Sequence, residues 1–472
     1  MAPSNQFANR SARQKAVLIR QRSQRPIAGF AIVPSVAMVW ALSAAPCHAE
    51  TLSQALARAY SSNPQINQQR ANLRAADESL PIARAGFLPS VNGQITGSSS
   101  TSDGNSSQSA TAGITVNQRL FNGFRTVNSI RQVDAGIRAS RAGLANAELS
   151  ILRAGAVAYI NVLRDGELLS LQKANRAFLD EQVRAAQARF DVGEGTRTDI
   201  ATAQAQQAAA LAQISAAQAT LRVSQAQYRQ IIGAAPANLK TPRVPAHLMP
   251  NSLQSARGIA LNRHPAIRAQ QFAADSEAFG VKIAEGALLP TLDVQGALST
   301  TANSGFAPSA NTASVSATLT IPLFAGGRNY ASVRQSKQRL AAQRIGVDEV
   351  RDQIRANVDE AWAQLTAARS VVSASQSQLE AGRLALKGVV EERNVGQRTT
   401  LDVLQAQRTV NEARIGLAEA SANQRAASYA IIAATGRLTA RALGLGVSYY
   451  DDRAHYELVK DKWFDLRTPS AR

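Results

Sequence analysis

The sequence predicts a mainly α-helical α+β chain in which one unit of helices and strands occurs twice. The first observation is a heptad seam from Val403 to Ala434, where large apolar residues and alanines alternate at spacings of three and four. The second is that the same seam occurs 203 positions earlier, from Ile200 to Ile231. The third is a pair of strand-like stretches ahead of each seam. Together these observations indicate an internal two-fold repeat built on long packed helices.

A secretory signal peptide is expected over residues 1–49. Six basic residues and no acidic residue occur in its first 25 positions, and an apolar run follows from Ile27 to Leu42. Cys47 and Ala49 are small residues suited to cleavage before Glu50. A retained anchor is the alternative interpretation. Cleavage would remove six of the +19 net charges and the only cysteine, so disulfides could not stabilise the exported chain.

Composition argues against several classes of function. The basic balance could suggest nucleic-acid binding, but no Lys/Arg-rich helix face is interleaved with aromatic residues. After the leader no stretch approaches 18 apolar residues, so no transmembrane helix is expected in the mature chain. Its histidines, His247, His264 and His455, are far apart and lack metal-ligand spacing. We therefore expect no catalytic residues, no cofactor, no metal and no nucleic-acid partner.

The first repeat is predicted to span residues 50–236. Asn63-Pro64 follows an initial helix, and the proline suits the first turn of the next helix. Four elements are then expected in order: strands over 89–99 and 112–120, a long helix over 125–190 and a return helix over 199–232. A Ser/Thr/Asn/Gly-rich loop would join the two strands.

The second repeat is predicted over residues 251–437, after a proline-rich linker at 237–250. It repeats the landmarks of the first, including a Leu-Phe-x-Gly-x-Arg motif at 120–125 and again at 323–328. Its elements are a helix, strands over 290–299 and 314–323, a long helix over 328–393 and a return helix over 400–435. A polar tail at 438–472 completes the chain.

The strand segments predict contact with a membrane. Between Val315 and Leu323 apolar residues alternate with small polar ones, a pattern typical of transmembrane β-strands. A soluble hairpin with one buried face is the alternative. Four strands cannot close a barrel, and an open sheet edge cannot lie in lipid because its backbone groups would be unpaired. Several identical chains would therefore have to pool their strands, eight from two chains or twelve from three.

This ordered duplication resembles the TolC outer-membrane channel family from Glu50 to about Leu443. The resemblance is carried by both Asn/His-Pro helix starts, both Leu-Pro strand starts, both Leu-Phe-x-Gly-x-Arg motifs and both Gly…Asp turns. It implies a homotrimer in the outer membrane of a Gram-negative bacterium, with a 12-stranded β-barrel continuing into a long α-helical barrel across the periplasm. It also implies a passive exit duct for efflux or type I secretion, docked to a periplasmic adaptor (membrane fusion) protein and an inner-membrane ABC or RND-type transporter.

The resemblance also implies functional residues at the helical turns. Asp402 falls on the family position of the narrowest acidic ring, whereas Gln405 replaces a second ring carboxylate. The gate-locking arginine falls on Arg398 and its carboxylate partner on Asp199, and Arg393 occupies the position of a gate tyrosine. Adaptor contacts fall on the turn residues Gly193, Gly195, Thr198, Gly396 and Thr399.

Two alternatives remain open at this point. Asp199 and Asp402 could serve only to cap helices, because aspartate is favoured in a first helical turn. The whole chain could be a non-transporting, periplasm-spanning coiled-coil structural or surface protein with a small β anchor. Four alternating strands in two duplicated pairs favour the channel, because a fibre would not need them. The cargo, whether drugs or secreted proteins, stays open.

Overall fold

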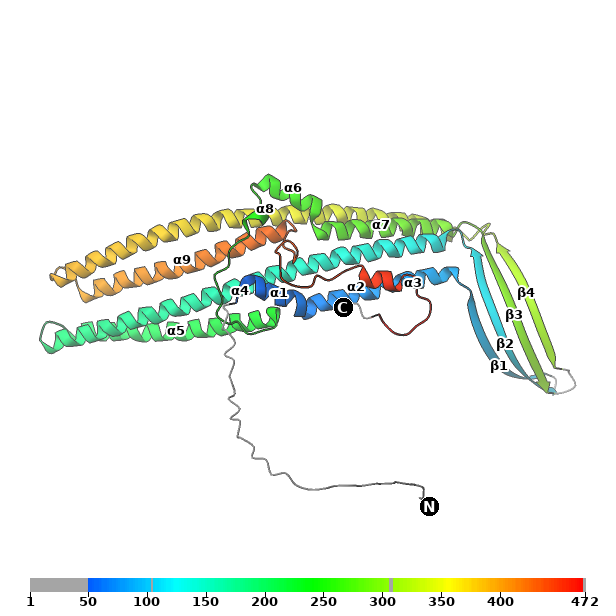
Figure 1. The fold of residues 1–472 in the computed structure, drawn as a ribbon, viewed down its shortest axis with the longest axis horizontal. Coiled ribbons are helices and arrows are strands. Elements are labelled where there is room, and N and C mark those ends of the chain that lie inside the picture. The colour runs from blue at the N-terminus through cyan, green and yellow to red at the C-terminus, as the bar shows by residue number, and fades with distance from the viewer. Residues whose placement is uncertain (1–49, 103–104, 305–308, 470–472) are drawn as a thin grey trace, which may run out of the picture. The chain divides into compact units, whose positions relative to one another are not determined.

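The computed structural model describes residues 50–102, 105–304 and 309–469. The expected signal peptide lies outside these ranges. The first repeat contains eight of the elements in Figure 1: α1 (Leu52–Ser62), α2 (Pro64–Asp77), α3 (Ser79–Arg84), η1 (Ala85–Phe87), β1 (Ser90–Ser102), β2 (Asn105–Phe121), α4 (Arg125–Asp191) and α5 (Arg197–Ile232).

The second repeat follows the same order. Its elements, with the short helix of the tail, are η2 (Ala246–Leu248), α6 (Leu253–Arg263), α7 (Pro265–Gly286), β3 (Thr291–Ser304), β4 (Ala310–Thr320), α8 (Arg328–Asn394), α9 (Thr400–Ala434) and α10 (Ala454–Val459). One difference separates the repeats. The single helix α7 corresponds to the segmented α2, α3 and η1, where Pro81 lacks the N–H that a continuous helix would need.

Both predicted proline positions are the first residues of helices, and the preceding residue caps each helix. Asn63 Oδ1 accepts a hydrogen bond from Gln65 N at 2.9 Å before α2. His264 Nδ1 accepts one from Ala266 N at 3.2 Å before α7. In both repeats a side chain therefore caps an N–H that would otherwise be unpaired at the helix start, asparagine in the first repeat and histidine in the second.

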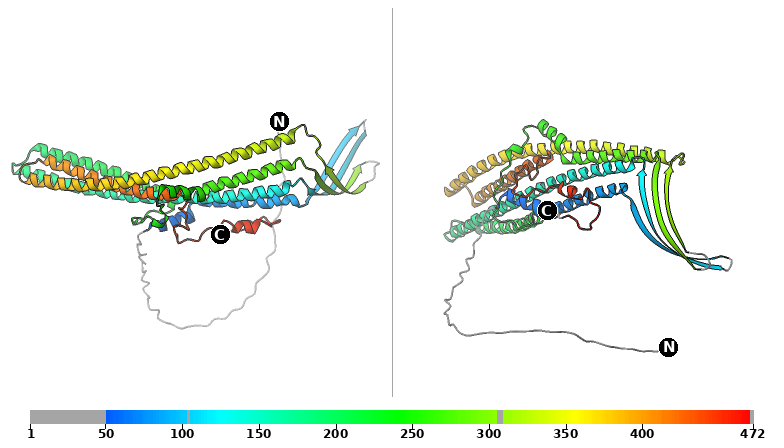
Figure 2. Two further views of the ribbon diagram at one scale, coloured as in Figure 1. Left: turned by 90° about the horizontal axis from the view of Figure 1, so that it is seen from above. Right: turned by 45° about the vertical axis from the view of Figure 1, so that its right-hand side comes forward.

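The long helices pack as two hairpins, α4 with α5 and α8 with α9 (Figure 1, Figure 2). Their seam is the one that the heptad pattern predicts, because Val403, Val410 and Ile431 are fully buried. The largest core cluster joins α1, α4, α5, α9 and the tail around Tyr159 and Tyr228. Among the described helices, none is both long and apolar enough to cross a bilayer.

The four strands form one antiparallel sheet in the order β1-β2-β3-β4. The strands differ from the predicted ranges because β1 continues to Ser102, β2 begins at Asn105, β3 continues to Ser304 and β4 spans Ala310–Thr320. Much of the predicted Ser/Thr-rich loop is thus strand. Its hydroxyl groups pair across β1 and β2, with Ser98 Oγ 2.8 Å from Ser109 Oγ and Ser100 Oγ 2.9 Å from Ser107 Oγ.

The end of β4 also corrects a prediction. The predicted strand runs to residue 323, but β4 ends at Thr320. Pro322 follows two residues later, and proline has no N–H to donate to a strand ladder. Ile321, Leu323 and Phe324 therefore lie beyond the sheet, and all three are exposed.

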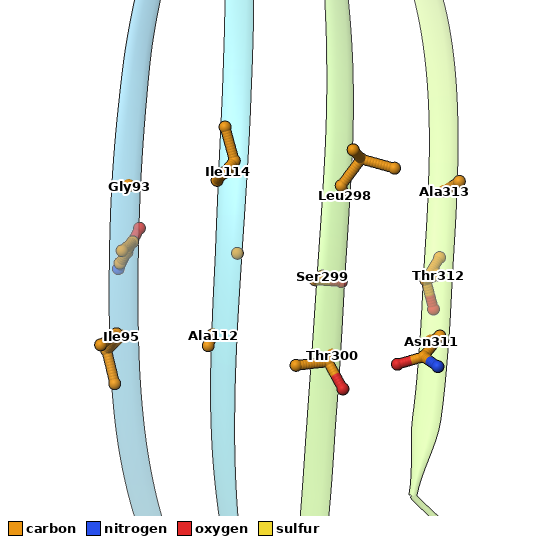
Figure 3. A pocket seen from close by; sticks show the side chains of 12 residues that line it. Gly93, Ile95, Ala112, Ile114, Leu298, Ser299, Thr300, Asn311, Thr312 and Ala313 are labelled. Atoms are coloured by element: carbon orange, nitrogen blue, oxygen red, sulfur yellow. The ribbon is translucent and has the colours of Figure 1, made fainter.

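One face of the sheet is apolar and the other is polar. The register sets Gly93 opposite Ile114, Ile114 opposite Leu298 and Leu298 opposite Ala313, so these residues share a face. Ile95, Ile114 and Leu298 project from this face in Figure 3. The apolar face consists chiefly of Val91, Ile95, Ile114, Val116, Val294, Leu298, Val315 and Leu319. Ile95 and Val315 are more than four-fifths exposed, so in this chain the face is open to its surroundings.

The tail packs along the first repeat. His455, on α10, is buried, and its Nδ1 lies 3.4 Å from Oδ2 of Asp77 at the end of α2. The guanidinium of Arg141 on α4 lies 4.7 Å from the ring centre of Tyr456. Burial raises the pKa of Asp77, partly offset by the nearby Arg141. These contacts hold the tail against α2 and α4.

Candidate functional site

The candidate entrance is formed by the two turns that join the helices of each hairpin. Gly193 and Gly396 adopt φ values of +82° and +81°, which residues with a side chain rarely adopt. In each turn the next residue's N–H then returns to the helix: Glu194 N donates to Arg189 O at 2.8 Å, and Gln397 N to Glu392 O at 2.9 Å. The two turns are therefore equivalent in backbone and differ in side chains.

Asp199 and Asp402 take part in matching capping boxes. Asp199 Oδ2 accepts hydrogen bonds from Thr196 N at 3.1 Å and Thr196 Oγ1 at 2.7 Å. Asp402 Oδ2 accepts equivalent bonds from Thr399 N and Thr399 Oγ1, both at 2.8 Å. These bonds lower the pKa of both carboxyl groups, so both are ionised at neutral pH. In the single chain, helix capping is thus a role of both aspartates.

Asp402 and Gln405 lie close together on α9. They are three residues apart on α9 and so lie on neighbouring parts of one helix face. Asp402 is half-exposed and Gln405 is exposed. A carboxylate and an amide on one face give each chain a single negative charge at this place.

Arg398 and Asp199 are not brought together within the chain. Arg398 Nε instead donates to Glu392 Oε2 at 2.8 Å, across the α8–α9 turn. This bond raises the pKa of Arg398. The sequence does not single out Glu392 as the partner of Arg398. Its counterpart in the first repeat is Arg189, so the duplication gives no signal for this ion pair.

Arg393 links the two hairpins. Its Nη1 donates to Gln182 Oε1 on α4 at 3.3 Å, while Arg189 Nη1 on α4 donates to Thr400 Oγ1 at 3.3 Å. Burial and the nearby Arg189 lower the pKa of Arg393. Gln182 and Arg189 are further residues that the sequence did not single out. These bonds cross the seam between the hairpins beside the turns.

The residues predicted to contact an adaptor lie on the surface of the turns. Gly193, Thr198, Gly396 and Thr399 are exposed, and Gly195 is partly exposed. Next to them Val192 and Val395, at equivalent positions, are each 71% exposed. The sequence pattern did not distinguish these valines from ordinary core residues, because turns carry no periodicity.

A charged pair lies on the polar face of the sheet. Arg119 Nε donates to Asp293 Oδ1 at 2.8 Å between β2 and β3. Among the strand residues that the structure describes, these two are the only charged ones. In the same described part of the chain, no three His, Cys, Asp or Glu side chains are grouped to hold a metal.

A sheet with one apolar face that continues into duplicated helical hairpins is a fold that this chain shares with a solved outer-membrane channel. The outer-membrane channel CmeC of Campylobacter jejuni superimposes with a TM-score of 0.73 at 17% identity, over 87% of this chain and 89% of that one, which shows the fold.

A family model described as outer membrane efflux protein matches residues 53–234 and 257–437. The chain belongs to the outer membrane efflux protein family. The efflux protein BepC of Brucella suis is 43% identical over 431 residues, 90% of this chain and 93% of BepC. TolC of Vibrio cholerae is 28% identical over 397 residues, 79% of this chain and 87% of TolC. The predicted family, outer-membrane location and efflux function are thereby confirmed.

Proposed function

We propose that three copies of this chain pool their strands into one 12-stranded barrel and that the helical hairpins continue it as a tunnel across the periplasm. The observation that carries this proposal is the four-stranded sheet. In the part of the chain that the structure describes, β1 and β4 each pair with another strand on one side only. Unpaired backbone groups at both edges are too costly in lipid, so neighbouring copies must pair with them.

The two faces of the sheet fix the orientation of the strands in this barrel. Ile95, Ile114 and Leu298 belong to the continuous apolar face and turn toward lipid. The hydroxyl- and amide-rich opposite face, with Arg119 and Asp293, lines a water-filled passage. Cargo then passes down a polar wall without being bound or chemically changed.

A gate at the turns is the second part of the proposal. Asp402 of each copy contributes to a ring of three carboxylates, with Gln405 one helical turn away. Arg398 and Asp199 do not pair within one chain, where their partners are Glu392 and Thr196, so we assign the lock of the closed state to a contact between neighbouring copies. Arg393 adds to the lock by joining α8 to α4. Each exposed ion pair contributes at most about 1 kcal/mol, but three copies act together.

The turns also supply the docking surface for partners. Export through a passive duct needs energy from another protein. We assign this role to an inner-membrane ABC or RND-type transporter, joined to the duct through a periplasmic adaptor protein. Val192 and Val395 support this assignment, because two exposed valines at equivalent positions offer apolar contacts beside Gly193 and Gly396. BepC is itself named an efflux protein, which favours efflux over protein secretion.

The lipid-facing orientation is tested by lysine substitutions at adjacent positions. Ile114→Lys puts a charge on the apolar face, where it should cost about 2–4 kcal/mol near the bilayer midplane. Thr115→Lys puts the same charge on the polar face of the same strand. We expect Ile114→Lys to abolish the heat-modifiable, three-fold-mass species in outer-membrane fractions and Thr115→Lys to retain it with changed conductance. Equal tolerance of both would refute the orientation.

The competing function is a non-transporting coiled-coil fibre with a β anchor. Purified protein in planar bilayers distinguishes the two, because the tunnel should conduct ions in discrete steps and a fibre should not. A soluble monomer in the periplasm would also favour the fibre.

A further inference from the structure

Residues 460–465 of the tail lie beside α3 and beside Leu88, just before the chain enters β1. Arg84, on α3, forms an ion pair with Asp461, and its Nη1 donates to Lys460 O at 2.8 Å. Trp463 and Phe464 line a hollow together with Leu88, two residues before β1 begins. The tail is therefore held close to the point where the chain enters the sheet.

This segment exposes large apolar side chains. Trp463 is 69% exposed, Phe464 87% and Leu466 fully exposed. On the neighbouring α3 and η1, Ile82 and Phe87 are also exposed. Scattered apolar residues are normal on a protein surface, but a cluster of this size marks a surface that contacts something else.

Four of the five charged residues in the segment 460–467 are in ion pairs. Lys462 Nζ lies 2.9 Å from Asp465 Oδ2, Lys460 pairs with Glu457, and Asp461 pairs with Arg84. A partner protein is usually recognised with specific polar or charged contacts around an apolar centre. Here four of the five charged side chains have a local partner, the exposed Arg467 stands outside these pairs, and the most exposed side chains are apolar or aromatic. This favours a non-specific apolar partner.

The level of the segment matches the edge of the apolar face. Val91 is the first residue of that face on β1, three positions after Leu88. Outer-membrane barrels usually carry a girdle of aromatic residues at this level, where ring and polar group meet the lipid headgroups. The described strands contain no Trp or Tyr, and Phe121 is their one aromatic residue. At this edge the strands are flanked by the exposed Phe87 and Phe324, but the strands themselves supply no ring that carries a polar group.

We propose that residues 460–467 form a lipid anchor that inserts Trp463, Phe464 and Leu466 into the headgroup region of the periplasmic leaflet of the outer membrane. The ligand is phospholipid, bound through its interfacial region without a requirement for anionic headgroups. The anchor supplies from the tail the tryptophan that the strands lack. This inference depends on the proposed placement of the sheet in the membrane.

Tryptophan fluorescence tests the proposal in the full-length processed protein. Besides Trp40 in the expected leader, the chain has only Trp362 and Trp463. The Trp362→Phe variant thus reports on Trp463 alone, and Trp463→Phe reports on Trp362, which packs against the helical core. A third variant, Trp362→Phe/Trp463→Phe/Ile95→Trp, places the reporter on the apolar face of β1.

Each variant is reconstituted into nanodiscs of phosphatidylcholine brominated either near the headgroup or deep in the acyl chain. We expect Trp463 to be quenched more by shallow than by deep bromines, Trp362 to be unquenched and the tryptophan at position 95 to be quenched. Adding phosphatidylglycerol should leave the quenching of Trp463 within about twofold of its value in phosphatidylcholine alone. If Trp463 is unquenched while position 95 is quenched, the anchor is refuted and the placement of the sheet stands.

Two other outcomes are also decisive. If neither Trp463 nor position 95 is quenched, the placement of the sheet itself fails. If Trp463 is inaccessible to both brominated lipid and aqueous iodide, a neighbouring copy covers it and the lipid anchor is refuted. As a separate check in the Trp362→Phe background, Phe464→Ser/Leu466→Ser should reduce the shallow quenching of Trp463, whereas the matched change Leu458→Ser on α10 should not.

Discussion

Arg119 and Asp293 form an ion pair that joins the two repeats across the centre of the sheet. The two residues lie directly opposite each other in the β2–β3 register, with Nε and Oδ1 2.8 Å apart. Their side chains are 54% and 42% exposed on a face that otherwise carries hydroxyl and amide groups. Each repeat thus contributes one half of the only charge pair on the described strands.

Breaking this pair should change ion selectivity more than stability. An exposed pair contributes about 1 kcal/mol at most, so single variants should still assemble. In the proposed trimer, Asp293→Asn would leave three unpaired arginines in the passage and should shift the reversal potential toward anions. Arg119→Gln should shift it toward cations, and the double variant should return near the wild type. Measurement in planar bilayers with a salt gradient decides this; identical potentials for all variants would place the pair outside the passage.

Gly123 and Gly326 hold equivalent positions in the two repeats and offer a matched comparison. Both have positive φ, so alanine at either should cost about 1–2 kcal/mol in backbone strain. At Gly123 a Cβ would also lie 2.2 Å from the carbonyl oxygen of Gly286, whereas at Gly326 it would meet nothing within 4 Å. We expect Gly123→Ala to lower the denaturation midpoint severely or prevent assembly, and Gly326→Ala to lower it modestly. Similar midpoints would contradict the close approach of α7 to the β2–α4 junction.

Because His264 is buried, we predict that the second repeat loses stability in acid. Burial lowers its pKa to about 4, from about 6.5 in an unfolded chain, because the charged form is disfavoured there. The unfolded chain therefore binds the extra proton first, and stability falls as pH decreases from about 6.5 to about 4, by on the order of 3 kcal/mol. His264→Asn should remove this loss and keep the cap, since Asn63 caps α2 in the first repeat. Denaturation midpoints between pH 4.5 and 7 provide the check; an unchanged pH slope would exclude His264.

Arg398 can be tested as a gate residue against its own-chain partner. Arg398→Ser should raise single-channel conductance if Arg398 holds the gate closed, and unchanged conductance would count against that role. Asp199→Asn should raise conductance similarly if the lock joins neighbouring copies. Glu392→Gln should have the smaller effect in that case, because it breaks only the bond across one turn. The opposite order would assign the effect to the shape of the turn.

The helices could be predicted closely from the sequence, and the sheet less so. The seam from Val403 to Ile431 is a local periodicity, and most of its residues are buried, with Ala406, Leu417 and Gln424 partly buried. The outer parts of β1 and β2, around Ser98–Ser102 and Ser106–Ser109, have polar side chains, mostly serine, on both faces. No alternation is present there, and only pairing with the opposite strand identifies these residues as strand.

The candidate site could be located from the sequence but its contacts could not. Repeated glycines and aspartates marked both turns, because capping depends on residues three apart. The partner of Arg398 and the bond from Arg393 to Gln182 depend on how α8 lies beside its own turn and beside α4. Similarly, nothing local in the tail shows that Trp463 lies next to Leu88, 375 positions away in the sequence.

The helices α4 and α8 are each 67 residues long, which corresponds to about 100 Å at 1.5 Å per residue. Equal length means that the two hairpins reach the same depth, and both turns can meet one flat partner surface. Seven residues inserted into α4 alone would displace its turn by about 10 Å relative to the turn after α8. A lineage whose cell envelope thickens must therefore lengthen both repeats, and their return helices, in concert.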